Sequence, residues 1–155
     1  MNESVFERIE SLLTRHGVHF EVLRHAPVFT SEEAAAIRGV PLATGAKALI
    51  CKVDSRFVML VIPADRKLDS KQARQALAIR ALRFASADEL RQLTGLAPGA
   101  IPPFGSHFGL PTYCDSRLAD QERINFNAGD HAISVSMRCA DYLAVERPTI
   151  ACFTA

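Results

Sequence analysis

The most restrictive feature of this sequence is a pair of strand-like runs, residues 47–53 and 57–62. In the first run, apolar and other side chains alternate, as they do in a strand whose two faces differ. The second run is continuously apolar, which is typical of a strand covered on both faces. Residues 54–56 separate the runs and predict a hairpin turn. We therefore expect the two runs to form a β-hairpin.

Helix ends are marked by a repeated sequence device, the S/T-x-x-E capping box. It occurs as Ser4 with Glu7, Thr30 with Glu33, and Ser86 with Glu89. Left-handed C-terminal stops are expected at Gly17, Gly39 and Gly95. A fourth helix is predicted over 69–78, with Gln72 reaching back to its cap, and a short last helix over 140–145.

Further strands are predicted over 19–23, 112–115, 124–127 and 132–137, the last two joined around Gly129 and Asp130. Strands and helices follow one another without a strict βαβ rhythm, which disfavours a parallel Rossmann sheet. The expected class is α+β: a mixed, largely antiparallel sheet or partly closed barrel surrounded by helices. With 155 residues and no linker, the chain is expected to form one domain, residues 1–155.

Composition narrows the functional classes. Apolar residues make up 48% of the chain and charged residues 23%, as in a protein with a packed core. The four cysteines form no C-x-x-C pair and the histidines have no ligand-like spacing, so neither a metal site nor a cofactor is expected. There is no signal peptide and no apolar run of about 20 residues, so we expect a cytoplasmic protein with no membrane partner.

Lys47 is the first candidate for chemistry. Strand alternation places it on the face of Leu49, Cys51 and Val53. A lysine among apolar side chains either extends to solvent or directs its ammonium into a pocket. In a pocket, that cation can hold a phosphate or polarise an ester.

The segment PGAIPPFG, residues 98–105, is the second candidate. Its three prolines and two glycines fix an unusual backbone path and leave N–H donors on Gly99, Ala100 and Ile101. Such donors can stabilise an oxyanion during acyl transfer. The alternative is a rigid connecting loop.

These two features together resemble the YbaK/ProX family, which includes editing domains associated with prolyl-tRNA synthetase. The resemblance rests on Lys47 in GAKALI and on Gly99 and Pro103 in a G-x-x-x-P loop about fifty residues later. It extends over nearly the whole chain through HAPVFTSEEAA, PADRKLD and FNAGDHAISVSM.

The resemblance implies an enzyme that deacylates mischarged aminoacyl-tRNA without a metal. It implies that Lys47, Gly99 and Pro103 position the aminoacyl group, while the terminal ribose hydroxyl of the substrate assists the attack. His131 lies at a suitable distance after the loop; strand parity with Ile133 lets it face inward, in a catalytic or a structural role. The residues expected to contact the substrate are His25, Phe29, Thr30, Ala100, Ile101 and Gly105.

A basic stretch is the candidate surface for tRNA phosphates. It includes Arg66, Lys67, Lys71 and Arg74, with Asp69 as the acidic residue among them. Lys71 and Arg74 share a face if the segment is helical. A solvated helix face explains the same pattern.

Other functional classes stay open on the sequence alone. Cys51 shares the face of Lys47 and is a conceivable nucleophile, but a buried apolar cysteine is the favoured interpretation. The chain is expected to remove a small amino acid (alanine, serine, threonine or cysteine), with tRNA for proline or a related tRNA as carrier. The alternatives are a non-catalytic module that binds tRNA or a synthetase, and a hydrolase of another small acyl ester.

Overall fold

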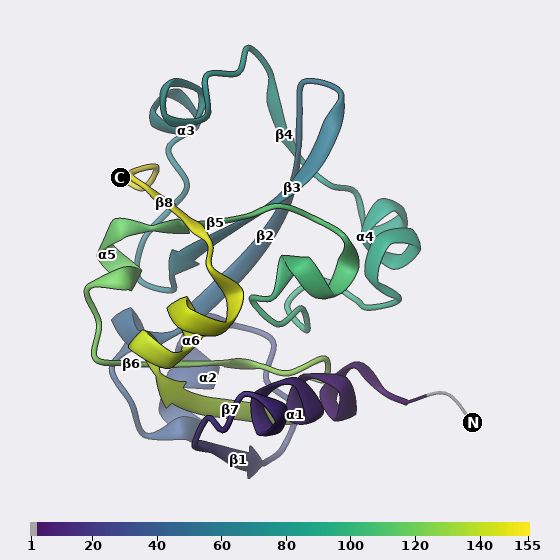
Figure 1. The fold of residues 1–155 in the computed structure, drawn as a ribbon, viewed down its shortest axis with the longest axis vertical. Helices are drawn as coiled ribbons and strands as arrows, with labels where there is room; N and C mark the ends of the chain where they lie inside the picture. The colour runs from purple at the N-terminus through teal and green to yellow at the C-terminus, as the bar shows by residue number, and fades with distance from the viewer. Residues whose placement is uncertain (1–2) are drawn as a thin grey trace.

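A computed structural model describes residues 3–155 as two β-sheets surrounded by helices (Figure 1). The three-stranded sheet is antiparallel and has the order β1 (Phe20–Arg24), β7 (Ile133–Arg138), β6 (Arg123–Asn127). The five-stranded sheet has the order β4 (Leu82–Phe84), β2 (Ala46–Val53), β3 (Arg56–Pro63), β5 (Thr112–Asp115), β8 (Thr149–Ala151). In it, β3 pairs with β5, and β5 with β8, in parallel. The α+β class with largely antiparallel pairing is confirmed, but with two sheets, neither of which closes into a barrel.

The α-helices in residues 3–155 are α1 (Val5–Arg15), α2 (Ser31–Arg38), α3 (Ser70–Leu77), α4 (Ala87–Thr94), α5 (Ser116–Ala119) and α6 (Cys139–Glu146). Helices α1, α2 and α4 begin where the capping boxes predict. Both hydrogen bonds of the box form at Ser4, Thr30 and Ser86. Asp69 caps α3 and accepts from the Gln72 backbone. Gly17, Gly39 and Gly95 all adopt the left-handed conformation after their helices, as predicted; at α1 the C-cap is His16, and Gly17 follows it.

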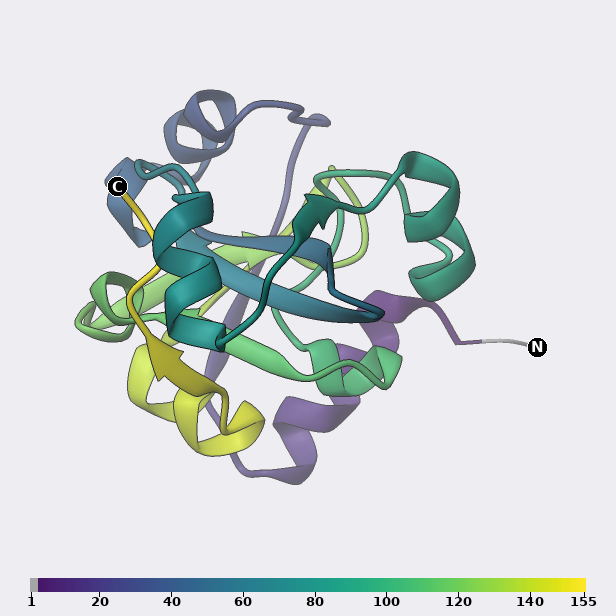
Figure 2. The same cartoon turned by 90° about the horizontal axis from the view of Figure 1, so that it is seen from above.

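The β2–β3 hairpin runs through the middle of the molecule with helices around it (Figure 2). One face of β2 contributes Ala46 and Ile50 to the larger core, which α1 and α6 also build. The other face contributes Cys51 and Val53 to a smaller core under α3. Strand β3 divides in the same way, with five consecutive residues from Val58 to Ile62 at most 2% exposed. The predicted strand covered on both faces is therefore confirmed.

Several short elements were not predicted: β4, β8, α5, and the 3-10 helices Leu42–Thr44 and Gly105–Phe108. The strand prediction over 132–137 was displaced by one residue, because β7 begins at Ile133. His131 therefore lies in the turn before the strand, and strand parity does not set its direction. None of the helices in residues 3–155 is long and apolar enough to cross a membrane.

A buried hydrogen bond from Tyr142 links α6 to the loop at Pro103. Tyr142 is fully buried on α6, and its hydroxyl donates to the Pro103 carbonyl at 2.6 Å. Tyr142→Phe leaves that buried carbonyl without its partner and should lower the free energy of unfolding by about 1–3 kcal/mol. Urea denaturation measures this.

The chain's other tyrosine, Tyr113, is the matched control. Its hydroxyl only accepts a 3.5 Å contact from Arg56 near the surface. Tyr113→Phe should change the unfolding free energy by less than about 0.5 kcal/mol. Equal losses in the two variants would contradict the assignment of the Tyr142 bond.

Candidate active site

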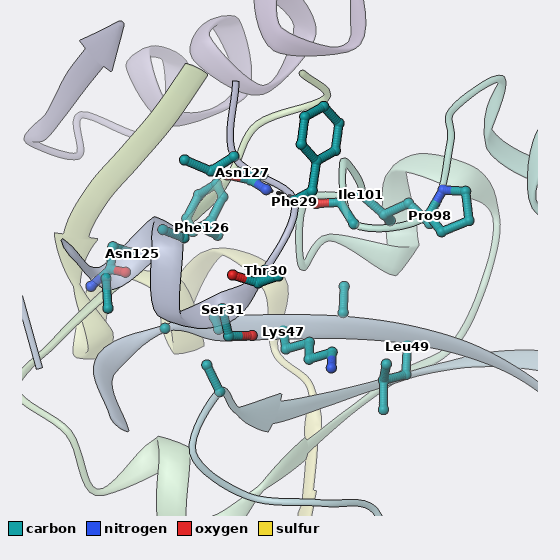
Figure 3. A pocket seen from close by; sticks show the side chains of 18 of the residues that line it. Phe29, Thr30, Ser31, Lys47, Leu49, Pro98, Ile101, Asn125, Phe126 and Asn127 are labelled. Carbon is teal, nitrogen blue, oxygen red and sulfur yellow. Dashed lines mark hydrogen bonds between the residues drawn. The ribbon is translucent and has the colours of Figure 1, made fainter. Parts of the chain in front are cut away.

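A cavity of about 660 Å³ opens where the two sheets meet. The junction is a parallel bridge between Gly45, just before β2, and Asn125 of β6. Figure 3 shows that its lining comes from separate segments of the chain. These are the start of α2 with the turn before it, the first half of β2, residues 64–67, the loop around Gly99, and β6 with His131.

Lys47 enters the cavity from the second position of β2. Its side chain is exposed and extends away from the strand (Figure 3). The predicted shared face with Cys51 and Val53 is correct, but the smaller core covers only the later residues of the strand. Lys47 makes no salt bridge with any residue in 3–155. Its ammonium is therefore available to a ligand.

The loop that begins at Pro98 is held by its carbonyl groups. The Asn127 side chain donates from Nδ2 to the Gly99 carbonyl at 2.8 Å. His131 Nε2 lies 3.0 Å from the Pro98 carbonyl. Because a carbonyl only accepts, this contact requires the proton on Nε2. Two side chains from the β6–β7 region thus fix two consecutive peptide groups.

Glycine is required at position 99 by conformation and by space. Gly99 has φ +86°, a region that L side chains rarely adopt. A Cβ atom there would lie 3.3 Å from His131 Nε2. A side chain would therefore strain the backbone and press on the residue that anchors the loop.

The rest of the loop lies behind the cavity wall. Ile101 lines the cavity, whereas Ala100, Pro103 and Gly105 do not. The Ala100 N–H bonds to the Ala97 carbonyl at 3.2 Å, so it is not the free donor that the sequence suggested. Gly105 is buried, and a Cβ atom there would meet Thr112 and Met59. Pro103 and Gly105 can thus influence a ligand only through the loop backbone.

Phe29 and Thr30 line the cavity from the start of α2. The Phe29 ring packs on the His131 ring with centroids 4.8 Å apart, although 73% of Phe29 remains exposed. His25 lies one layer behind. Its Nδ1 contacts the Ala26 carbonyl at 2.8 Å and its Nε2 the Ser134 hydroxyl at 2.7 Å, and it does not line the cavity.

Arg38, at the end of α2, is a site residue that the sequence analysis missed. It lines the cavity, and its guanidinium donates to Ser134, Asn125 and Asn127 at 2.6–2.9 Å. No carboxylate within residues 3–155 pairs with it. Burial lowers its pKa to about 10, so it stays charged at neutral pH. The one available signal was that basic residues favour the last turn of a helix, which gives no indication of burial.

The predicted basic surface divides into two parts. Arg66 and Lys67 line the cavity and are exposed. Lys71 and Arg74 lie on α3, outside the lining, and Arg74 bonds to Ser70 at 2.9 Å. Only the first pair is therefore contiguous with Lys47.

Cys51 lacks the properties of a nucleophile. It is fully buried in the smaller core. Burial raises the pKa of the Cys51 thiol to about 12, which keeps it protonated at neutral pH, and the thiolate is the reactive form. The described residues also hold no group of three or more His, Cys, Asp or Glu side chains arranged to bind a metal.

Comparison with known proteins then defines the family. A family model described as "Aminoacyl-tRNA editing domain" matches residues 25–145, which include Lys47, the loop and His131. The chain belongs to this family. The resemblance drawn from the sequence motifs is thereby confirmed.

Individual relatives agree with this assignment. The Escherichia coli K12 protein named "Multifunctional Ser/Thr-tRNA deacylase ProXp-y" is 36% identical over 95% of this chain and 91% of its own length. A Bacillus subtilis proline–tRNA ligase is 30% identical over 69% of this chain, which corresponds to 20% of the ligase. A crystal structure described as a candidate trans-editing enzyme for prolyl-tRNA synthetase superposes with a TM-score of 0.87 at 24% identity, covering 100% of this chain and 99% of that one.

Proposed function

We propose that this chain acts in trans to hydrolyse the ester bond of mischarged aminoacyl-tRNA, with serine and threonine as the first candidates for the amino acid removed. The observation that carries the proposal is the cavity itself, which brings together Lys47 and the anchored Gly99 loop. The editing family and the name of the E. coli relative support the reaction and the amino acids. Its substrate is charged in the cytoplasm, where we propose that the protein acts.

The chemistry follows from an exposed cation and a fixed backbone. Lys47 supplies positive charge to a group that becomes more negative in the transition state. In a trans peptide the C=O and N–H groups point in opposite directions, so the bond from His131 to Pro98 turns the Gly99 N–H away from the histidine. We propose that this N–H contacts the aminoacyl group, and that Pro103 keeps the loop rigid.

No side chain in the cavity has the neighbours of an activated nucleophile, and the Cys51 thiol lies outside the lining. We therefore propose direct attack by water, assisted by the free ribose hydroxyl of the substrate's terminal adenosine. Phe29, Thr30 and Ile101 supply the walls that select the amino acid. A wall that differs by one methylene discriminates by only about 1–3 kcal/mol, which fits activity on more than one small amino acid.

Two other functions make different predictions. A non-catalytic module would bind tRNA or a synthetase without turnover, and the partial match to proline–tRNA ligase favours a synthetase as partner. A hydrolase of small acyl esters would be indifferent to the tRNA body. Turnover measured on a panel of mischarged tRNAs and on free aminoacyl esters separates the three.

Lys47→Ala should leave the fold intact and lower deacylation by about 100-fold or more, because a positioned charge is lost. Single-turnover hydrolysis of mischarged tRNA measures this. Lys52→Ala is the matched control: Lys52 lies on the opposite face of the same strand, over the Phe57 ring. A folded Lys47→Ala protein with wild-type turnover would remove Lys47 from the site.

The basic residues are tested by salt dependence. Replacing Arg66 and Lys67 by alanine should raise KM for full-length tRNA and flatten its dependence on salt, because fewer phosphate contacts release fewer counterions. Replacing Lys71 and Arg74 tests whether α3 belongs to the same surface. A minimal aminoacyl-adenosine ester should respond little to either change. An unchanged salt slope for both pairs would locate the tRNA-binding surface elsewhere.

Substrate assistance is tested with a modified tRNA. A tRNA that ends in 2′-deoxyadenosine and carries a 3′ ester lacks the assisting hydroxyl, so its hydrolysis should be slower by about 100-fold or more. Chelators and thiol reagents should have little effect on the normal substrate. Equal rates for the two tRNAs, or an acyl group trapped on the protein, would overturn this mechanism.

A further inference from the structure

Arg38 is a half-buried cation without an acidic partner in the described chain, and neighbouring polar side chains surround its guanidinium. All three guanidinium nitrogens donate: Nε to Ser134, one terminal nitrogen to Asn125 and the other to Asn127. A partly desolvated charge without an opposite charge is unfavourable for stability. Its presence at a cavity wall therefore indicates a role beyond packing.

The guanidinium holds the oxygen end of two asparagine amides. An arginine only donates, so the Oδ1 atom of each amide must point toward it. The Nδ2 atom of Asn127 is then directed to the Gly99 carbonyl at 2.8 Å. Arg38 and the Gly99 carbonyl thus hold the two ends of the Asn127 amide.

The second asparagine extends the network to the opposite wall of the cavity. Asn125 is 4% exposed, and its Nδ2 donates to the Thr44 hydroxyl at 2.8 Å, three residues before Lys47. Asn125 also pairs with Gly45 through the bridge that joins the sheets. One guanidinium thus orients the contacts of both the Gly99 loop and the start of β2.

His25 completes the network behind the cavity. Its Nδ1 must donate to the Ala26 carbonyl, which leaves Nε2 to accept from the Ser134 hydroxyl. Ser134 can then accept from Arg38 Nε while it donates to His25. Ser134 and His25 thus continue the hydrogen-bond network from Arg38 to the chain segment before α2.

We propose that Arg38 is a positioning residue for ester hydrolysis: through Asn125 and Asn127 it sets the placement of the Gly99 loop relative to Lys47. This inference rests on the proposed function. Arg38 acts through the two amides and not by contact with the reacting atoms. A loop displaced by about 1 Å is sufficient to slow a positioned reaction by about 100-fold.

Asn127→Asp is the sharpest test, because it separates stability from positioning. The carboxylate still accepts from Arg38, and gains an opposite charge, but it has no donor for the Gly99 carbonyl. We expect a melting temperature at or above that of the wild type, kcat lower by at least about 10-fold, and KM nearly unchanged. Wild-type kcat in a folded Asn127→Asp protein would overturn the proposal.

Arg38→Lys tests the fork geometry, since one ammonium cannot reach three separate acceptors as the guanidinium does. It should lower kcat in the same way. Arg91→Lys, on the exposed face of α4 beside Asp88, is the matched control and should leave kcat unchanged. If Arg38 and Asn127 act through the same bond, the double variant should lose no more activity than the worse single variant. If the activity losses of the two single variants add in the double variant, Arg38 does not act through Asn127.

Hydrogen exchange supplies a readout that does not depend on activity. Loss of the Asn127 bond should speed exchange of the Ala100 amide, which belongs to the turn that this bond holds, while amides in the β2–β3 hairpin stay protected. If the wild type fails to hydrolyse any mischarged tRNA, the proposed function fails, whereas unchanged exchange in Asn127→Asp contradicts the positioning role itself.

Discussion

The β2–β3 hairpin is the constraint on which the rest of the molecule depends. Each strand has two apolar faces, and each face belongs to a different core. Helices α1 and α6 must cover one side and α3 the other, which fixes the layers. Toward its beginning, β2 extends past the smaller core, and there the strand carries Lys47 instead of an apolar residue. The same strand therefore organises the packing and presents a cation to the cavity.

What was predictable from the sequence was determined by local chemistry. The side chains of a capping box bond to backbone N–H groups of the same helix start. Ser4, Thr30 and Ser86 therefore predict helix starts from local sequence alone. The hairpin was also predictable, because its two apolar runs and the turn between them are contiguous in sequence. By contrast, β4 and β8 have three residues each, and they are strands only because β2 and β5 offer free edges to pair with. A run of three residues is too short to show in the sequence that such an edge will be available.

The site follows the same division. The motifs indicated Lys47 and the Gly99 loop as candidates. They did not indicate that the Ala100 N–H bonds to the Ala97 carbonyl within a turn, or that Pro103 and Gly105 do not line the cavity. Arg38 was missed because a basic residue at a helix end ordinarily faces solvent. The positioning role proposed for Arg38 depends on Asn125, Asn127 and Ser134, which are 87 to 96 residues away in sequence. Only the folded chain brings those acceptors together.

The pairing of β1 with β7 has a consequence for how the protein is made. Phe20 finds its partner only at Met137, and the cavity is finished only when Asn125, Asn127 and His131 come against segments from the first third of the chain. On the ribosome, β2 and β3 can pair with each other soon after synthesis because a short turn joins them, whereas β1 must wait for β7. The pocket is thus among the last parts to assemble. The hairpin also gains its full packing late, because β5, α6 and Phe153 complete its edge and its two cores.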